Sequence, residues 1–230
     1  MVKSLGGISR QSCVIIVVLV LTVLQGISAF SQSEVIRRTY VWNYGGRTWS
    51  FAYDFPRSTY QTQKSLTRTL DYMAYDVYVN DPREDPVLRD FVTQFDATVT
   101  GLTVWYRLNL IIALVQSIPY VGETCEYPRY PIEMLVDQQG DCEDAAILTA
   151  ALVRQMGFGV VLLAFLEEHH MAVGIRVLPP DHQYLQSYAW KGDAYYYLEP
   201  TSLGWSIGQI PPTYRSVPTI VHLAPVYANR

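Results

Sequence analysis

Residues 140–157 read GDCEDAAILTAALVRQMG and contain the clearest helix signal in the chain. Asp141 is a favourable N-cap residue, Asp144 follows it at the spacing of a capping box, and Gly157 is typical of the residue just after a helix. The apolar residues between them recur at the spacing of one buried helical face. They are Ile147, Leu148, Ala151, Leu152 and Met156. The sequence therefore predicts a helix over residues 141–156 with one face in the core.

Cys142 is the first residue after this N-cap. Unpaired backbone N–H groups and the positive end of the helix dipole lie there, and both stabilise a thiolate, the form of cysteine that attacks carbonyl groups. A structural cysteine could occupy the same position, since cysteine often packs as a small buried hydrophobe. The position makes Cys142 a candidate nucleophile and leaves the structural alternative open.

Three carboxylates surround Cys142 in the sequence: Asp141, Glu143 and Asp144. Negative charge nearby disfavours a thiolate, unless the acids point into the helix cap or bind a cation. Calcium prefers oxygen ligands of this kind. A capped, solvated helix start and a calcium site are both open interpretations of these acids. The thiol chemistry itself requires no cofactor.

A thiol nucleophile needs a base to receive and return its proton. The chain has four histidines, two of them adjacent: His169, His170, His182 and His222. His170 precedes a strand-like run at residues 171–177, from which it can project toward a helix start, and His169 would face the opposite way. Glu199 follows the strand-like run at residues 195–198 and is placed to orient an imidazole.

The other patterns predict helices first and a sheet later, which is typical of an α+β domain. Residues 40–55 indicate a hairpin around the turn Gly45-Gly46. Helical spacing is irregular over residues 64–79 and clear over residues 86–95 and 101–118, and a loop is expected over residues 119–140. A third strand-like run occupies residues 160–166.

Residues 1–31 are expected to lie outside the fold. Lys3 and Arg10 precede an apolar, uncharged run at residues 13–30, which is at the lower edge of what spans a bilayer. The same pattern fits a secretory signal cleaved after Ser31. A retained membrane anchor and a cleaved signal peptide are both open. Either one predicts that the rest of the chain is extracytoplasmic, membrane-anchored or secreted.

Charge and cysteine content limit the possible partners. The chain has 17 basic and 21 acidic residues, and its two basic residues within 1–31 leave the remainder more acidic still. This balance argues against nucleic acid as a partner. Only Cys125 and Cys142 remain beyond residue 31. They could form one disulfide in an oxidising compartment, or one of them could be a reactive thiol.

Four segments together resemble transglutaminase-like proteins. Residues 140–144 (GDCED) and the helix after them resemble the nucleophile helix, and residues 170–174 (HMAVG) resemble the histidine strand. Residues 198–201 (LEPT) resemble the acidic strand end, with Glu199 one methylene longer than the usual aspartate. Residues 130–135 (YPIEML) are similar to the lead-in of bacterial and archaeal transglutaminase-like cysteine proteinases, with Met134 in place of threonine.

This resemblance implies a papain-like α+β core over residues 101–230, with the nucleophile helix packed on an antiparallel sheet. Residues 32–100 would add an N-terminal hairpin and helical region to the same domain. Cys142, His170 and Glu199 would form the catalytic triad and act through an acyl-thioester on Cys142. The oxyanion would be held by the Cys142 N–H and one further donor, for which the candidates are Gln116, Tyr130 and Trp105. Relatives that use the acids flanking the cysteine for calcium favour a calcium site at Asp141, Glu143 and Asp144.

The favoured function is a cysteine peptidase that hydrolyses amide bonds of a protein or peptide substrate. An amide-exchanging transglutaminase would share the same triad and the same thioester. A non-catalytic, membrane-tethered binding or assembly domain is the alternative from a different class. Its signature would be a disulfide between Cys125 and Cys142, which would block the nucleophile.

Overall fold

The computed structural model describes residues 34–180 and 184–224. The expected signal or anchor at residues 1–31 and the residue His182 lie outside these ranges. Within the described ranges, no helix has the length and apolar character needed to cross a membrane. The chain from Val35 onward forms one compact unit.

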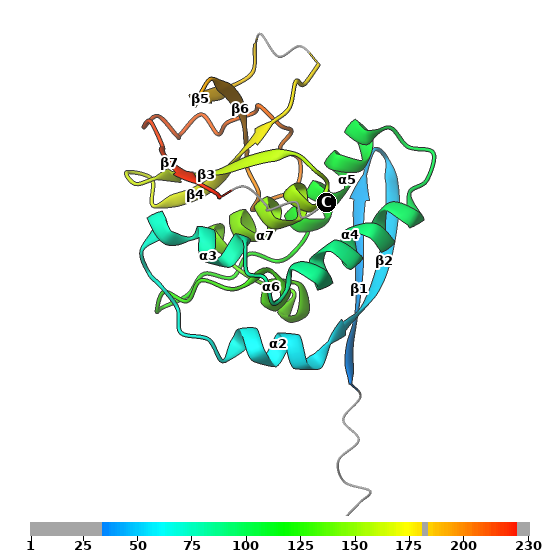
Figure 1. The fold of residues 1–230 in the computed structure, drawn as a ribbon. Helices are drawn as coiled ribbons and strands as arrows, with labels where there is room; N and C mark the ends of the chain where they lie inside the picture. The colour runs from blue at the N-terminus through cyan, green and yellow to red at the C-terminus, as the bar shows by residue number, and fades with distance from the viewer. Residues whose placement is uncertain (1–33, 181–183, 225–230) are drawn as a thin grey trace, which may run out of the picture. The chain divides into compact units, whose positions relative to one another are not determined.

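A five-stranded antiparallel sheet forms the C-terminal half of this unit (Figure 1). Its strand order is β5-β6-β4-β3-β7. The strands are β3 (Gly159–Phe165), β4 (His170–Arg176), β5 (Ser187–Trp190), β6 (Asp193–Leu198) and β7 (Thr219–His222). The strands predicted at residues 160–166, 171–177 and 195–198 are confirmed as β3, β4 and β6, each within one or two residues of the predicted ends.

Helices and an N-terminal hairpin complete the unit. The helices are α2 (Arg57–Lys64), α3 (Asp76–Val79), α4 (Asp85–Thr98), α5 (Val104–Gln116), α6 (Pro131–Asp137) and α7 (Cys142–Gln155), with a 3-10 turn η1 at Tyr72–Ala74. Strands β1 (Val35–Tyr44) and β2 (Arg47–Pro56) pair antiparallel. Gly45 and Gly46 lie between them at positive φ, as the predicted two-residue hairpin turn requires.

The helix predicted over residues 141–156 is observed as α7. Asp141 is the N-cap of α7, and its backbone N–H donates to the carboxylate of Asp144 at 3.3 Å. Gly157 follows the helix at a positive φ of 92°. Nearly the whole of α7 is buried, because it packs on β3 and β4 on one side and on α4, α5 and α6 on others (Figure 1). The packing of this helix on an antiparallel sheet agrees with the arrangement expected from the sequence.

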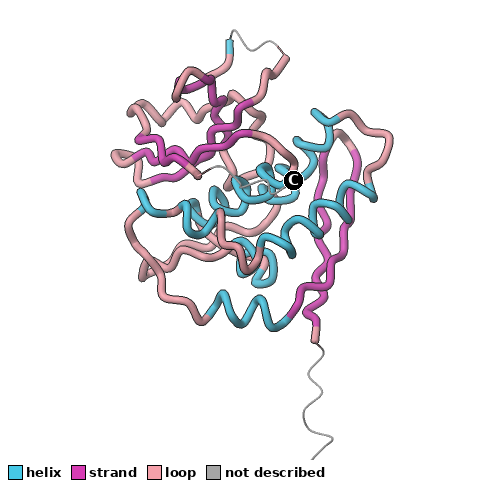
Figure 2. The backbone as a smooth tube through the Cα atoms, in the orientation of Figure 1, coloured by secondary structure: helices cyan, strands magenta, loops and turns pink. Residues whose placement is uncertain are grey.

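The two faces of the sheet are covered differently. On the helix face, alternate strand residues such as Leu162 and Val173 join the main core with α7. On the loop face, Leu163 and Phe165 form a second cluster. Residues 199–218, which contain no helix or strand (Figure 2), add Ile210 and Tyr214 to that second cluster. The alternation of strand side chains therefore divides the C-terminal half into a helix face and a loop face.

One local prediction was wrong, and two further segments were left undefined by the sequence. Residues 119–140 contain α6, which Pro128 and Pro131 concealed because they resemble the prolines of a loop. Pro131 occupies the first turn of α6, where proline is well tolerated. Residues 64–79, where the sequence signals were mixed, are mostly irregular between the end of α2 and α3, and Leu70 and Val77 are exposed. Strand β5 was not predicted, because its four residues are too short for a clear alternation.

Candidate active site

Cys142 is the first helical residue of α7, as predicted. Its thiol donates to the Glu143 carboxyl at 3.3 Å and accepts the backbone N–H of Met171, the residue after His170. The nucleophile candidate therefore lies against the first residues of β4. Both described cysteines are free: Cys142 is partly buried and Cys125 is exposed. The disulfide that would mark a non-catalytic domain is not formed between them.

The environment of Cys142 favours the neutral thiol. Burial and the charges of Glu143 and Asp141 raise its pKa, and the Met171 N–H lowers it by less. The sequence left open whether the helix N-terminus or the neighbouring acids would dominate. In this structure the acids and the burial dominate.

The three acids around Cys142 have different partners. Asp144 is held by Arg129, whose backbone N–H donates to one carboxylate oxygen at 2.6 Å and whose guanidinium pairs with the other. Glu143 is buried beside Asp141. Burial, and then the hydrogen bond and charge of Asp141, raise the pKa of Glu143 to about 9. Asp144 therefore serves the helix cap, whereas Glu143 is a neutral acid in contact with the sulfur.

His170 is oriented by Glu199. The imidazole Nε2 and the Glu199 Oε2 are 3.0 Å apart, and both side chains are nearly buried. With Nε2 engaged by the acid, Nδ1 is the ring nitrogen left to serve the thiol. The extra methylene of glutamate does not prevent the contact predicted for this position.

The Glu199 carboxylate accepts four hydrogen bonds. Besides His170, it receives the Tyr197 hydroxyl at 2.8 Å, and the Thr201 N–H and hydroxyl at 3.1 and 2.6 Å. Burial raises the pKa of Glu199, but the hydrogen bonds and charge of His170, with those of Thr201 and Tyr197, lower it more, so that it lies below its usual value. The acid is held ionised in a buried position, as an orienting carboxylate must be.

The base lies on the opposite face of the sheet from the nucleophile helix. His170 is directly opposite Phe165 in the register of β3 and β4, and Phe165 belongs to the loop face. The Tyr214 ring, also on the loop face, lies 4.9 Å from the imidazole between centroids. Cys142 lies against the backbone of Met171, and His170 lies on the loop face, so both candidate residues lie at the start of β4.

The predicted oxyanion donors have other described contacts. Gln116, at the end of α5, uses its amide group to donate to the backbone carbonyls of Glu199 and Trp205, at 2.8 and 3.0 Å. Tyr130 is buried before α6 with its ring against Tyr78. Trp105 is part of the core packing of α5. Gln116 thus holds the backbone at Glu199 and at Trp205 by hydrogen bonds.

Sequence reasoning did not identify Tyr120 and Tyr214. Tyr120 pairs with Gly140, two residues before Cys142, and its pKa is raised by burial and then by the charges of Cys142 and neighbouring acids. Tyr214 packs on His170. Neither residue lies in the four segments that carry the resemblance, and both reach the site through packing between segments far apart in the sequence. The other histidines lie elsewhere: His169 is in the turn before β4, and His222 contacts Trp190.

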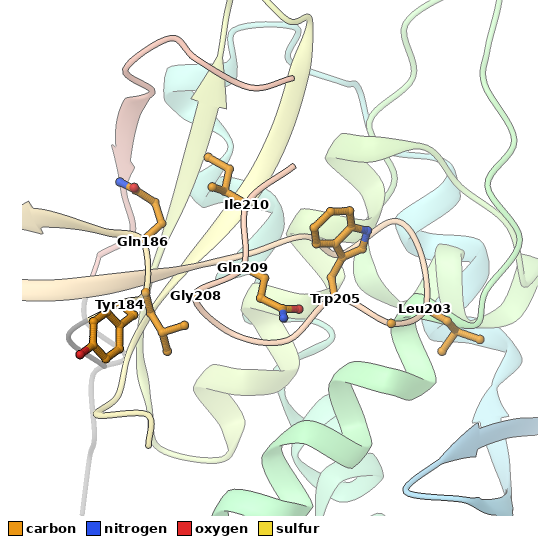
Figure 3. A pocket seen from close by; sticks show the side chains of 9 residues that line it. Tyr184, Gln186, Leu203, Trp205, Gly208, Gln209 and Ile210 are labelled. Atoms are coloured by element: carbon orange, nitrogen blue, oxygen red, sulfur yellow. The ribbon is translucent and has the colours of Figure 1, made fainter. Parts of the chain in front are cut away.

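A hollow of about 990 Å³ lies beside the chain that follows Glu199 (Figure 3). Its lining includes Leu203, Trp205 and Ile210 from that segment, and Tyr184 and Gln186 from the chain before β5. Trp205, which lines the hollow, accepts a hydrogen bond from the Gln116 amide at its backbone carbonyl. The same amide donates to the backbone carbonyl of Glu199.

The calcium site predicted from the sequence would use the acids beside Cys142, namely Asp141, Glu143 and Asp144. Among the described residues, no three His, Cys, Asp or Glu side chains are gathered in a way that would hold a metal ion. Asp141 and Glu143 offer only oxygen ligands, and one buried oxygen of Asp141 has no hydrogen-bond partner. Asp141 and Glu143 therefore fit calcium in chemistry, whereas Asp144 is engaged by Arg129.

The chain is distantly similar to solved structures of other proteins. No protein-family model matches the chain, and no curated protein matches it. Among solved structures it resembles Legionella pneumophila LapG, with 16% identity and a TM-score of 0.37 over 65% of this chain and 75% of that one. It also resembles a Cytophaga hutchinsonii protein proposed to be a cysteine protease, with 13% identity and a TM-score of 0.39 over 81% of this chain and 72% of that one.

Both likenesses are too weak to carry a functional argument, so function has to be argued from the site. The described residues have the α+β architecture that the sequence predicted, with Cys142 at the start of α7, His170 at the start of β4 and Glu199 just after β6.

Proposed function

We propose that this protein is a cysteine peptidase of the transglutaminase-like class, which hydrolyses amide bonds of protein or peptide substrates. The observation that supports it most is the 3.0 Å contact between His170 and Glu199 at the start of β4, where the Cys142 thiol accepts the N–H of Met171. A buried, ionised acid, an imidazole and a thiol at a helix N-terminus form the constellation that thiol acyl transfer requires.

In the proposed reaction, His170 takes the proton of the Cys142 thiol as the sulfur attacks the substrate carbonyl. The backbone N–H of Cys142, free at the first turn of α7, donates to the oxyanion. His170 then protonates the leaving amine, and a thioester remains on Cys142. Water, deprotonated by His170, attacks the thioester, and release of the acid restores the thiol. Glu199 keeps the imidazole oriented and stabilises its charged form.

Hydrolysis is favoured over amide exchange because residues 130–135 are similar to the lead-in of the proteinases. The hollow next to Trp205 is a candidate position for a substrate side chain, because it adjoins the chain that holds Glu199. The reaction would take place outside the cytoplasm if residues 1–31 serve as signal or anchor.

Calcium is part of the same proposal. Asp141 and Glu143 would be its ligands, and the ion would supply positive charge next to the sulfur, where two carboxyls now raise the thiol pKa. Isothermal titration of the full chain with calcium tests this without a substrate. Wild type should bind and the variant with Asp141→Asn and Glu143→Gln should not, whereas equal heats for both would refute the site.

The decisive test of the enzyme is alkylation of the full chain by iodoacetamide, quantified on the Cys142 peptide by mass spectrometry, with and without calcium. Cys125 serves as an internal reference because it is exposed and free. His170→Ala should slow labelling of Cys142 by roughly a hundredfold, while the matched variant His169→Ala should not. Equal rates in all three proteins would mean that His170 does not activate the thiol.

Hydrolysis and amide exchange are separated by product. The wild-type chain is incubated with a complex peptide mixture and monodansylcadaverine. New peptide N-termini that Cys142→Ala fails to produce support a peptidase, whereas incorporation of the amine supports a transglutaminase. If neither product forms and labelling is independent of His170, the non-catalytic binding or assembly domain is the better description.

A further inference from the structure

The irregular segment at residues 211–218 carries a tyrosine onto the catalytic imidazole. The rings of Tyr214 and His170 have centroids 4.9 Å apart and planes inclined by 45°. Tyr214 also contacts Phe165, with ring centroids 5.6 Å apart. Since Phe165 is the strand partner of His170, the tyrosine covers a cross-strand pair at the edge of the loop face.

The segment is fastened to the turn that precedes the catalytic strand. Glu168, two residues before His170, accepts the backbone N–H groups of Arg215 and Ser216 at 2.9 and 3.0 Å, and the Ser216 hydroxyl at 2.5 Å. The hydrogen bonds from Ser216 and Arg215 lower the pKa of Glu168 to about 2, so the clamp is charged over the physiological pH range. The same turn thus fixes both the imidazole and the tyrosine that lies on it.

Core packing alone does not describe the position of Tyr214. Its ring is only half-buried, at the boundary between the loop-face cluster and the site. Burial, then the charges of Glu199 and Cys142, raise the pKa of its hydroxyl to about 12. The tyrosine therefore lies in the field of both partners of His170.

We propose that Tyr214 is a positioning residue for His170, held in place by the Glu168 clamp. Its ring restricts rotation of the imidazole and keeps water from the hydrogen bond between Nε2 and Glu199. Nδ1 is thereby kept available to Cys142. This role presupposes the proposed thiol chemistry and adds a contact that no triad residue provides. A misplacement of about 1 Å in a reacting group can cost a hundredfold in rate, so a ring that fixes the imidazole is worth a measurable factor.

The test compares paired variants of the full chain. Tyr214→Ala and Tyr214→Phe are matched with Tyr188→Ala, because Tyr188 contacts Phe165 from the same cluster but not His170. Glu168→Gln is matched with Glu167→Gln, a neighbouring exposed acid. For each protein, the rate of iodoacetamide labelling at the Cys142 peptide is measured at pH values from about 5 to about 9. The melting temperature of each protein is also recorded.

Tyr214→Ala should slow labelling roughly tenfold to a hundredfold and shift the pH midpoint of the profile, while Tyr214→Phe should restore both. Glu168→Gln should cause a smaller loss in the same direction, and Glu167→Gln none. Tyr188→Ala should lower the melting temperature without moving the pH midpoint.

Two outcomes would overturn the role of Tyr214. Unchanged rate and midpoint in Tyr214→Ala, with labelling still dependent on His170, would remove the tyrosine and leave the proposed function intact. Equal losses in Tyr214→Ala and Tyr188→Ala, with no change in midpoint, would reduce the tyrosine to core packing. Labelling that is also independent of His170 would instead refute the proposed function itself.

Discussion

Two buried glutamates of the candidate site, Glu143 and Glu199, differ in their protonation. Both side chains are almost completely withdrawn from solvent. Glu199 is surrounded by donors, and the hydrogen bonds it accepts hold its pKa below the usual value despite burial. Glu143 is buried beside another carboxyl, Asp141, and a thiol, so that burial and the charge of Asp141 raise its pKa.

The difference shows that burial alone does not set the charge of an acid in this site. Burial opposes ionisation of both glutamates, and the number of donors decides which of them overcomes it. A third acid, Asp144, shows another solution, because a guanidinium accompanies it into the interior. The surroundings of His170 and Glu199 therefore stabilise an ionised acid, whereas the surroundings of Cys142 and Glu143 favour the neutral forms of both groups.

The largest effect is expected for Glu199→Gln. A neutral amide presents N–H groups where the wild-type carboxylate accepts from Tyr197, Thr201 and His170, so the imidazole loses its orienting partner. Acylation of Cys142 by p-nitrophenyl acetate, followed as the nitrophenol burst, should fall by roughly 10²- to 10⁴-fold. Glu167→Gln is the control, and a burst equal to wild type would show that Glu199 does not serve His170.

The second effect is on stability. Arg129→Ala removes the cation from Asp144, whose side chain is 0% exposed. The free energy of unfolding should fall by about 3–5 kcal/mol, since an unpaired charge is left in the interior. Urea denaturation measures it. Arg89→Ala, which breaks an exposed pair with Asp85, should cost less than about 1 kcal/mol. Similar losses for the two variants would contradict the distinction between buried and exposed acids.

Glu143→Gln should make the surroundings of Cys142 less unfavourable to charge, as those of Glu199 already are. Above about pH 9, where Glu143 ionises, its replacement should raise the alkylation rate of Cys142 by about tenfold, which corresponds to about one unit in the thiol pKa, and at neutral pH the rate should change little. A lower rate would mean that Glu143 assists the thiol.

The same variant should also change the pH dependence of stability. A carboxyl with a raised pKa holds a proton in the folded chain that the unfolded chain has released. The free energy of unfolding of wild type should therefore fall as the pH rises from the usual range of glutamate toward about 9. This slope should be reduced in Glu143→Gln, as urea titrations at several pH values would reveal.

The smallest effect is expected for Tyr197→Phe, which removes one of the four hydrogen bonds to Glu199. A net loss of about 1 kcal/mol predicts a burst rate several-fold lower. Tyr195→Phe, two residues earlier on β6, is the matched control. No change in Tyr197→Phe would show that the remaining donors are sufficient to keep Glu199 ionised.

Local sequence was enough wherever the structure depends on neighbouring residues. The Asp141 cap, the buried face of α7, the Gly45-Gly46 turn and the strand that starts at His170 were all predicted, because caps, turns and periodicity act over a few residues. The order of Cys142, His170 and Glu199 along the chain was likewise readable from motifs. Helix α6 was missed because Pro128 and Pro131 resemble the prolines of a loop, although Pro131 occupies the first turn of the helix, where proline is well tolerated.

Tertiary structure alone decided the electrostatics. The sequence placed three acids beside Cys142 but could not show that Asp144 pairs with Arg129 while Glu143 is buried against Asp141. It gave no sign of Tyr214, because the contact with His170 depends on how residues 199–218 return across the sheet and on the clamp at Glu168. Such contacts join residues far apart in the chain, and the pKa of a buried group depends on those neighbours rather than on its own position in the sequence.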